Sequence, residues 1–79
     1  MPTVLLIIGF RLHFYSREEK RIHIHITKGN ATIKIWMDTF EIASSKGFGM
    51  KEKSLAIKLA RKYEKEITQK WKEHFENKT

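Results

Sequence analysis

The chain has 79 residues, a formal net charge of +7 at pH 7, 41% hydrophobic residues and no cysteine. This length fits one domain with one small core, and the lack of cysteine excludes disulfides and thiolate metal ligands. No apolar run reaches the ~20 residues of a membrane span, so we expect a cytoplasmic protein with no membrane partner. The positive charge favours a polyanionic partner, most commonly nucleic acid.

The first part of the chain predicts two strands. Residues 3–8 form a largely aliphatic run, which is typical of a strand that is covered on much of both faces. Gly9 then allows a tight turn. Residues 10–16 alternate between an apolar face and a polar or aromatic face, namely Phe10, Leu12 and Phe14 against Arg11, His13 and Tyr15.

The next predicted strand covers residues 22–27, where isoleucine alternates with histidine. A period of two sends the three isoleucines into the core and places His23 and His25 on the opposite face. This face is where any chemistry of the protein is expected.

A fourth strand is predicted at residues 32–37, after a turn at residues 28–30 whose Gly and Asn accept positive φ. In an antiparallel pair the register follows from the loops. It predicts two rows across the face that carries the histidines: His13, His25 and Lys34 in one, and Tyr15, His23 and Trp36 in the other.

The last segment predicts one long helix. Residues 44–47 are interpreted as a turn, and Gly49 as the residue before the first helical turn. Over residues 50–75 an apolar side chain recurs at every fourth position: Leu55, Leu59, Tyr63, Ile67 and Trp71. The predicted fold class is therefore α+β, a four-stranded antiparallel β-meander packed on one face by a long C-terminal amphipathic helix in a single domain.

The polar side of this helix carries a basic ridge, which consists of Lys58, Arg61, Lys62, Lys65 and Lys72. One interpretation is ordinary solvated lysines that form weak pairs, such as Lys62 with Glu66. The other is contact with a phosphate backbone, for which Lys and Arg spaced along a helix are well suited.

The histidine face also has more than one interpretation. Alternating polar residues are ordinary on the outer face of an antiparallel sheet. Alternatively, aromatic and imidazole rings stack on unpaired RNA bases while cations meet phosphates. The residues for this second role are Arg11, Tyr15, His23, His25, Lys34 and Trp36.

A third interpretation is a site with chemistry. His23, His25 and His13 are weak candidates for a metal site, because no carboxylate is placed with them. The same histidines near Lys34 are candidate catalytic groups for RNA cleavage, with Lys34 stabilising phosphoryl charge. We expect no cofactor, because the chain has no P-loop and no dinucleotide fingerprint.

Several short motifs resemble the small bacterial family known as domain of unknown function 4160, in the same order and spacing along the chain. They are Met1 to Val4, Phe14 to Ser16, His23 to Ile26, Lys28-Gly29, Lys34 to Trp36, Glu41 to Ala43, Lys46 to Phe48, Trp71 and Phe75. The chain departs from the family pattern at Lys20, Arg21 and Thr39, where prolines are usual.

The resemblance implies a stand-alone cytoplasmic protein encoded beside another small protein, as in toxin–antitoxin pairs, with His23, His25 and Trp36 on the functional face. We therefore expect a nucleic-acid-associated protein, RNA being favoured over DNA, with a small partner from a neighbouring gene. The alternatives are a His-dependent or metal-dependent ribonuclease or hydrolase, and an interaction module that docks a partner through its outer sheet face. A core this small also makes a homodimer a candidate.

Overall fold

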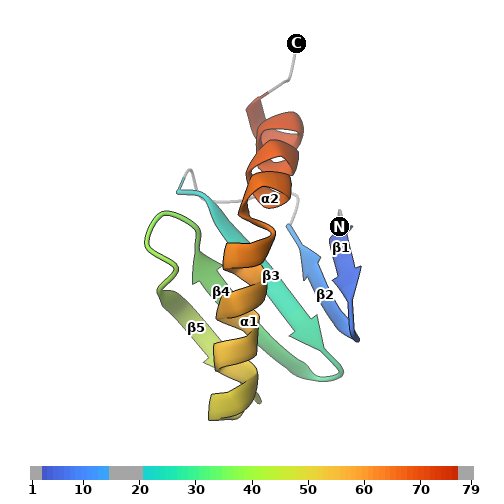
Figure 1. The fold of residues 1–79 in the computed structure, drawn as a ribbon, viewed down its shortest axis with the longest axis vertical. Coiled ribbons are helices and arrows are strands. Elements are labelled where there is room, and N and C mark those ends of the chain that lie inside the picture. Colours follow the sequence, from blue (N-terminus) through green and yellow to red (C-terminus); the bar gives the residue numbers. More distant parts are fainter. Residues whose placement is uncertain (1–2, 15–20, 77–79) are drawn as a thin grey trace.

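The fold is a five-stranded antiparallel sheet with helices on one side, described here from a computed structural model over residues 3–14 and 21–76 (Figure 1). The strands follow one another in space as they do along the chain. They are β1 (Thr3–Ile7), β2 (Phe10–His13), β3 (His23–Lys28), β4 (Ala31–Trp36) and β5 (Ile42–Lys46). Two α-helices and a π-helical turn follow: α1 (Met50–Lys62), α2 (Glu64–Trp71) and η1 (Lys72–Glu76). The α+β class and the antiparallel meander are confirmed.

The core lies between the sheet and α1, which crosses one face of the sheet (Figure 1). Alternate strand residues supply the sheet side of this core: Phe10, Leu12, Ile24, Ile26, Ile33 and Ile35. On the helix side, Ala56 and Ala60 are fully buried beside Leu59. We call this sheet face the inner face. The opposite face, which includes His13, His23, His25, Lys34 and Trp36, is the outer face.

The prediction of four strands was wrong, because β5 forms a fifth. Its residues pair with β4, Ile42 opposite Ile35 and Ser44 opposite Lys34. The sequence predicts a turn at residues 44–47, because Ser, Lys and Gly have neither alternation nor high β-propensity. The pairing with β4 overrides this local preference, and only Gly47, with φ +87°, turns the chain.

The prediction of one long helix was also wrong, because the helix is interrupted at Tyr63. Its backbone has φ −105° and ψ 23°, so α1 ends there and α2 begins. Apolar residues every four positions drift by ~40° per step around a straight helix. The interruption lets Ile67 and Trp71 stay buried, whereas Leu55 at the other end of the stripe is exposed.

The prediction that the first strand is covered on much of both faces was wrong as well. β1 is an edge strand, and Leu6 and Ile8 are 72% and 80% exposed. Ile7 packs against the core. An aliphatic run alone does not distinguish a central strand from an edge strand with one open face.

Ile8 occupies a strained position in the turn between β1 and β2. Ile8 and Gly9 have φ values of 49° and 80°, and Ile7 pairs with Phe10, so both central residues of a two-residue hairpin turn are left-handed. A β-branched residue is disfavoured there, whereas Asn accepts it.

Ile8→Asn is therefore expected to raise the free energy of unfolding by about 1 kcal/mol. Urea denaturation of wild type and variant measures this difference. Ile8→Val keeps the β-branched strain and is expected to give no gain. A loss of stability in Ile8→Asn would show that the positive φ of Ile8 does not carry the strain assigned to it.

Candidate functional site

The outer face carries the rows of side chains that the sequence predicts. His13 pairs with His25, His25 with Lys34, and His23 with Trp36. The register predicted for these residues is confirmed. Tyr15, predicted beside His23, lies outside the described residues. A further row crosses the sheet through Arg11, Thr27, Thr32 and Lys46.

The histidine rings of this face form one continuous cluster, which we call the imidazole row: His13, His25 and His23. The rings of His13 and His25 are stacked with centroids 5.9 Å apart and 24° between their planes. His23 meets His25 edge to face at 5.1 Å and meets Trp36 in the same way at 5.5 Å. The row is thus a packed set of rings with defined orientations.

Much of the imidazole row is buried. Only 1% of His13 and 0% of His23 is exposed. Stacking of unpaired bases on these two rings is therefore not available in this structure. His25 and Trp36 are only partly buried.

The side chain of Trp71, in α2, packs against residues at one end of the sheet. Its ring lies 5.2 Å from that of Phe14, at 88°, and 5.2 Å from that of His23, at 66°. Phe14 follows β2 and His23 begins β3. The last turn of α2 thereby connects the core to the imidazole row.

The tautomer of His23 follows from its hydrogen bond. Its Nδ1 lies 2.7 Å from the carbonyl oxygen of Arg21. A carbonyl oxygen only accepts, so Nδ1 must carry the hydrogen and donate it. In neutral His23 the deprotonated nitrogen is then Nε2, on a ring that is fully buried.

An ion pair that the sequence analysis did not predict lies beside Trp36. Arg21 Nε and Nη2 each donate to a carboxylate oxygen of Asp38 at 2.9 Å. The Arg21 guanidinium also lies over the Trp36 ring, 4.2 Å from its centroid, and Lys34 Nζ lies 4.6 Å from the same centroid. Extending the His23–Trp36 register by two residues pairs Arg21 with Asp38. The ion pair could therefore have been predicted from the sequence.

The bidentate hydrogen bonds from Arg21 lower the pKa of Asp38 below its ordinary value of 3.8. A lowered folded-state pKa means that ionised Asp38 stabilises the fold above pH 3.8, and that this contribution disappears as the pH falls through the folded-state pKa. Both side chains are partly exposed, so the contribution is weakened by salt.

We expect Asp38→Asn to be less stable than wild type at neutral pH and the difference to shrink as the solution is acidified below pH 3.8. Thermal unfolding at a series of pH values, at low and high salt, measures this convergence. Glu64→Gln, at another exposed carboxylate, serves as the control. A stability difference that does not change with pH would contradict the assigned role of the ion pair.

The structure offers limited support for chemistry on the outer face. Among residues 3–14 and 21–76, no group of three His, Asp or Glu side chains is arranged to hold a metal ion. Of the four candidate catalytic residues, His13 and His23 are buried, which leaves His25 and Lys34 in partial contact with solvent. A general base must lie within hydrogen-bonding distance of the proton that it removes, and the buried rings of His13 and His23 are not accessible to a substrate in this structure.

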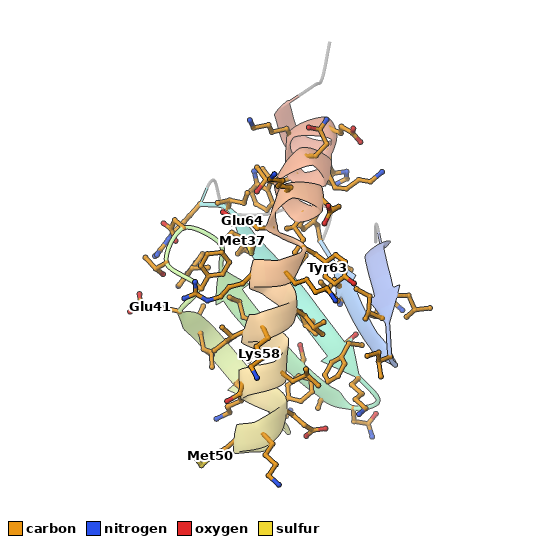
Figure 2. All side chains as sticks on the ribbon, in the orientation of Figure 1. Met37, Glu41, Met50, Lys58, Tyr63 and Glu64 are labelled. Atoms are coloured by element: carbon orange, nitrogen blue, oxygen red, sulfur yellow. The ribbon has the colours of Figure 1, made fainter. Side chains whose placement is uncertain are left out.

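The basic ridge lies on the helices. Lys58, for example, projects from the side of α1 that faces away from the sheet (Figure 2). The ridge and the outer face are therefore separate surfaces on opposite sides of the sheet. The nucleic-acid residues predicted from the sequence fall into two groups: Arg11, His23, His25, Lys34 and Trp36 on the sheet, and Lys58, Arg61, Lys62 and Lys65 on the helices.

All five residues of the ridge are exposed. Within the described part of the chain none of them forms an ion pair, and Lys62 is not paired with Glu66. Two residues of the ridge lie over aromatic rings of the same chain. Arg61 Cζ is 4.5 Å from the centroid of the Phe40 ring, and Lys62 Nζ is 5.5 Å from the centroid of the Tyr63 ring.

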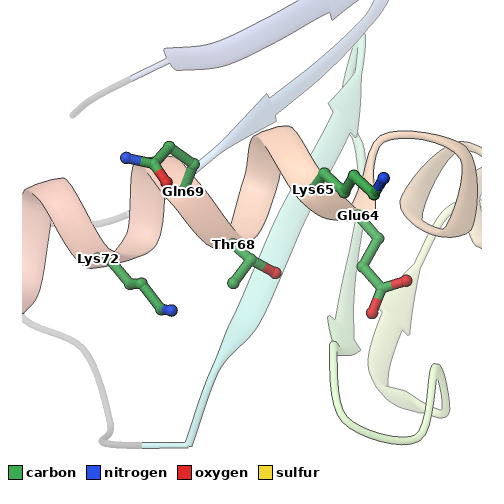
Figure 3. Close-up of a pocket in the computed structure, with 5 residues that line it drawn as sticks. All are labelled: Glu64, Lys65, Thr68, Gln69 and Lys72. Carbon is green, nitrogen blue, oxygen red and sulfur yellow. The ribbon is translucent and has the colours of Figure 1, made fainter.

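The part of the ridge on α2 borders a shallow depression of about 440 Å³ (Figure 3). Five side chains of α2 and its C-terminal end line it: Glu64, Lys65, Thr68, Gln69 and Lys72. The lining is polar, and the two lysines are separated along the helix by Thr68. The depression resembles a contact surface for a polar chain more than a closed pocket for a small molecule.

None of the helices in the described residues is long and apolar enough to cross a membrane. Comparison with curated proteins and with solved structures gave no match. The family model described as domain of unknown function (DUF4160) matches residues 9–72, from the first hairpin turn to the residue after Trp71. It includes the imidazole row, Trp36 and the basic ridge. The chain therefore belongs to the DUF4160 family.

Proposed function

We propose that this protein associates with nucleic acid through the basic ridge, and that its partner in the cytoplasm is RNA in preference to DNA. The observation that carries this proposal is the set of five exposed cations on α1, α2 and the first residue of η1, none of which is ion-paired in the described part of the chain. Such cations bind phosphates with release of counterions.

The spacing of the ridge supports contact with a phosphate backbone. Lys58, Lys62 and Lys65 are three or four residues apart and so share one side of the helices. At a rise of 1.5 Å per residue they extend over about 10 Å. The formal net charge of the whole chain, +7, has the same sign and adds to the attraction.

RNA is favoured by the polar groups between the cations. Thr68 lies between Lys65 and Lys72 in the depression on α2 (Figure 3). A hydroxyl group at this place is suited to bond a ribose 2′-hydroxyl while the lysines contact phosphates. The buried rings of the imidazole row do not take part in this interface.

Two variants with equal loss of charge test the ridge. Lys58→Gln with Lys62→Gln removes two of its cations, whereas Lys51→Gln with Lys70→Gln removes two exposed cations elsewhere on the helices. Fluorescence anisotropy with labelled single-stranded RNA, double-stranded RNA and double-stranded DNA is measured over a range of salt concentrations.

We expect wild-type affinity to fall steeply with salt, and the ridge variant to lose about 0.7 from the log-log slope for each RNA phosphate contact removed. The control pair is expected to keep most of the slope. Binding that is undetectable or independent of salt would exclude the proposed function. Equal losses in both variants would exclude the ridge as its site.

Membership of the family extends the proposal to a toxin–antitoxin-like module with a small protein encoded beside this one. Co-expression with the product of the neighbouring gene, followed by sedimentation of the purified proteins, tests this part separately. A mixture that sediments as two independent species would contradict it.

A further inference from the structure

The turn between β4 and β5 holds a phenylalanine in a conformation that L residues rarely adopt. Phe40 has φ 62°, in the left-handed region, where a bulky side chain is disfavoured. Two backbone hydrogen bonds close the turn: Phe40 N–H donates to the carbonyl oxygen of Trp36 at 2.7 Å, and Trp36 N–H donates to that of Glu41 at 2.9 Å. Strain of this kind persists only where the surrounding structure imposes it, and it is common at ligand-binding sites.

The ring of Phe40 supports the guanidinium of Arg61. Phe40 is partly buried and packs against the core. Arg61 Cζ lies over the ring, 4.5 Å from its centroid, which is a cation–π contact. Arg61 is exposed, and in the described part of the chain it forms no ion pair. The strained turn thus holds a guanidinium that a ligand can reach from solvent.

A guanidinium held in this way differs from the lysines of the basic ridge. It is planar, so its face can stack on a second ring while the N–H groups at its edge form hydrogen bonds. A lysine ammonium is a point charge without a face. Because contact with Phe40 already restricts the side chain of Arg61, less conformational entropy is lost when a ligand binds. The pair is therefore suited to a planar ligand.

The neighbouring cation indicates which planar ligand fits. Lys58 precedes Arg61 by three positions on α1, so the two side chains are neighbours on the surface of the helix. A phosphate at Lys58 and a ring stacked on Arg61 therefore belong to the same nucleotide or to adjacent ones. The bases of a duplex are stacked on each other inside the helix, so only an unpaired base can reach the guanidinium.

We propose that Arg61, positioned by Phe40, stacks on an unpaired base of a single-stranded RNA whose phosphates contact the basic ridge. This inference rests on the proposed function and specifies the form of RNA that the ridge binds. Phe40 acts through Arg61 as a positioning residue. Every base has a π face, so stacking accepts all four bases and we expect little sequence preference.

Two labelled ligands with the same number of phosphates test this contact. One is a single-stranded oligouridylate, and the other is an abasic ribose phosphate oligomer of equal length. Fluorescence anisotropy with the full chain measures both affinities over a range of salt concentrations. We expect wild type to bind the oligouridylate about tenfold or more tightly than the abasic oligomer, because only the oligouridylate offers a base for stacking.

Arg61→Lys keeps the charge of the side chain and removes its plane. This variant is expected to lower the ratio of the two affinities to about one, with binding of the abasic oligomer unchanged. Arg21→Lys is the matched control, because Arg21 also lies over an aromatic ring, but that ring is Trp36 on the outer face. The control is expected to keep the wild-type ratio. Circular dichroism checks that all variants are folded.

A double-mutant cycle separates the positioning role of Phe40 from its packing against the core. Phe40→Leu keeps the strained backbone and an apolar side chain but removes the ring. It is expected to lower the affinity ratio when Arg61 is present and to have no effect on the ratio in the Arg61→Lys background. Phe40→Tyr, which keeps a ring, is expected to retain the ratio. A folded Phe40→Leu protein with the wild-type ratio would contradict the assigned role.

The outcomes distinguish this inference from the proposed function. Equal affinity of wild type for the two oligomers, with binding that weakens as salt is added, overturns the stacking contact and leaves the proposed function in place. A preference for the oligouridylate that is lost in Arg21→Lys and kept in Arg61→Lys places stacking on the outer face and also overturns it. Absence of salt-dependent binding to both oligomers overturns this inference and the proposed function together.

Discussion

Trp71→Ala is expected to lower the free energy of unfolding by about 3–5 kcal/mol, which is much of the total stability of a small domain. The indole is nearly buried and contacts the rings of Phe14 and His23. Its removal leaves a cavity at the end of the sheet and opens the imidazole row to water. Urea denaturation followed by circular dichroism measures the loss.

Two variants show whether this effect belongs to the ring at this position. Trp71→Phe keeps an aromatic ring and is expected to lose less than Trp71→Ala. Lys72→Ala, at the exposed neighbouring residue, is expected to stay within about 0.5 kcal/mol of wild type. A Trp71→Ala protein of wild-type stability would show that α2 does not stabilise the end of the sheet.

Gly47→Ala is expected to lower the free energy of unfolding by about 2 kcal/mol or more. Gly47 has φ +87°, a left-handed conformation that disfavours an L side chain. A Cβ atom added there would also lie 3.1 Å from Cβ and 3.2 Å from Cα of Ala31, so the end of β5 would have to move away from β4.

Gly29→Ala separates these two causes. Gly29 also has a positive φ, of 59°, but an added Cβ would meet no atom within 4 Å. The decrease in the free energy of unfolding of Gly29→Ala therefore reports backbone strain alone, and the decrease in Gly47→Ala is expected to be larger. Ala31→Gly in the Gly47→Ala background should recover part of the difference. If Gly29→Ala and Gly47→Ala are equally destabilised, close packing at Ala31 has no measurable cost.

The strands that pack against α1 were predictable because alternation in the sequence reflects a sheet with one buried face. Short loops then determined the register, so the neighbours His13, His25 and Lys34 followed from counting residues. Counting residues in the same register also places Arg21 opposite Asp38, whose ion pair lies just outside the predicted strands.

Features without a local pattern were not predictable. The fifth strand is made of residues with little preference for a strand, and it forms because β4 offers a free edge at that point. The helix is interrupted at Tyr63, although no proline or glycine near this residue predicts a break. The distinction between a central and an edge strand at residues 3–7 depends on which strands pair, and the aliphatic run contains no information about that.

The sequence by itself determined the inner face of the sheet, the register of the histidines and the basic side of the helices, because each depends on a period of two or of about 3.6 residues. Only the tertiary structure decided that His13 and His23 are buried, and that the basic ridge and the outer face lie on opposite sides of the protein. Burial depends on contacts between residues far apart in the chain, as when Trp71 packs on His23. Such contacts have no period along the chain, so no sequence pattern predicts them.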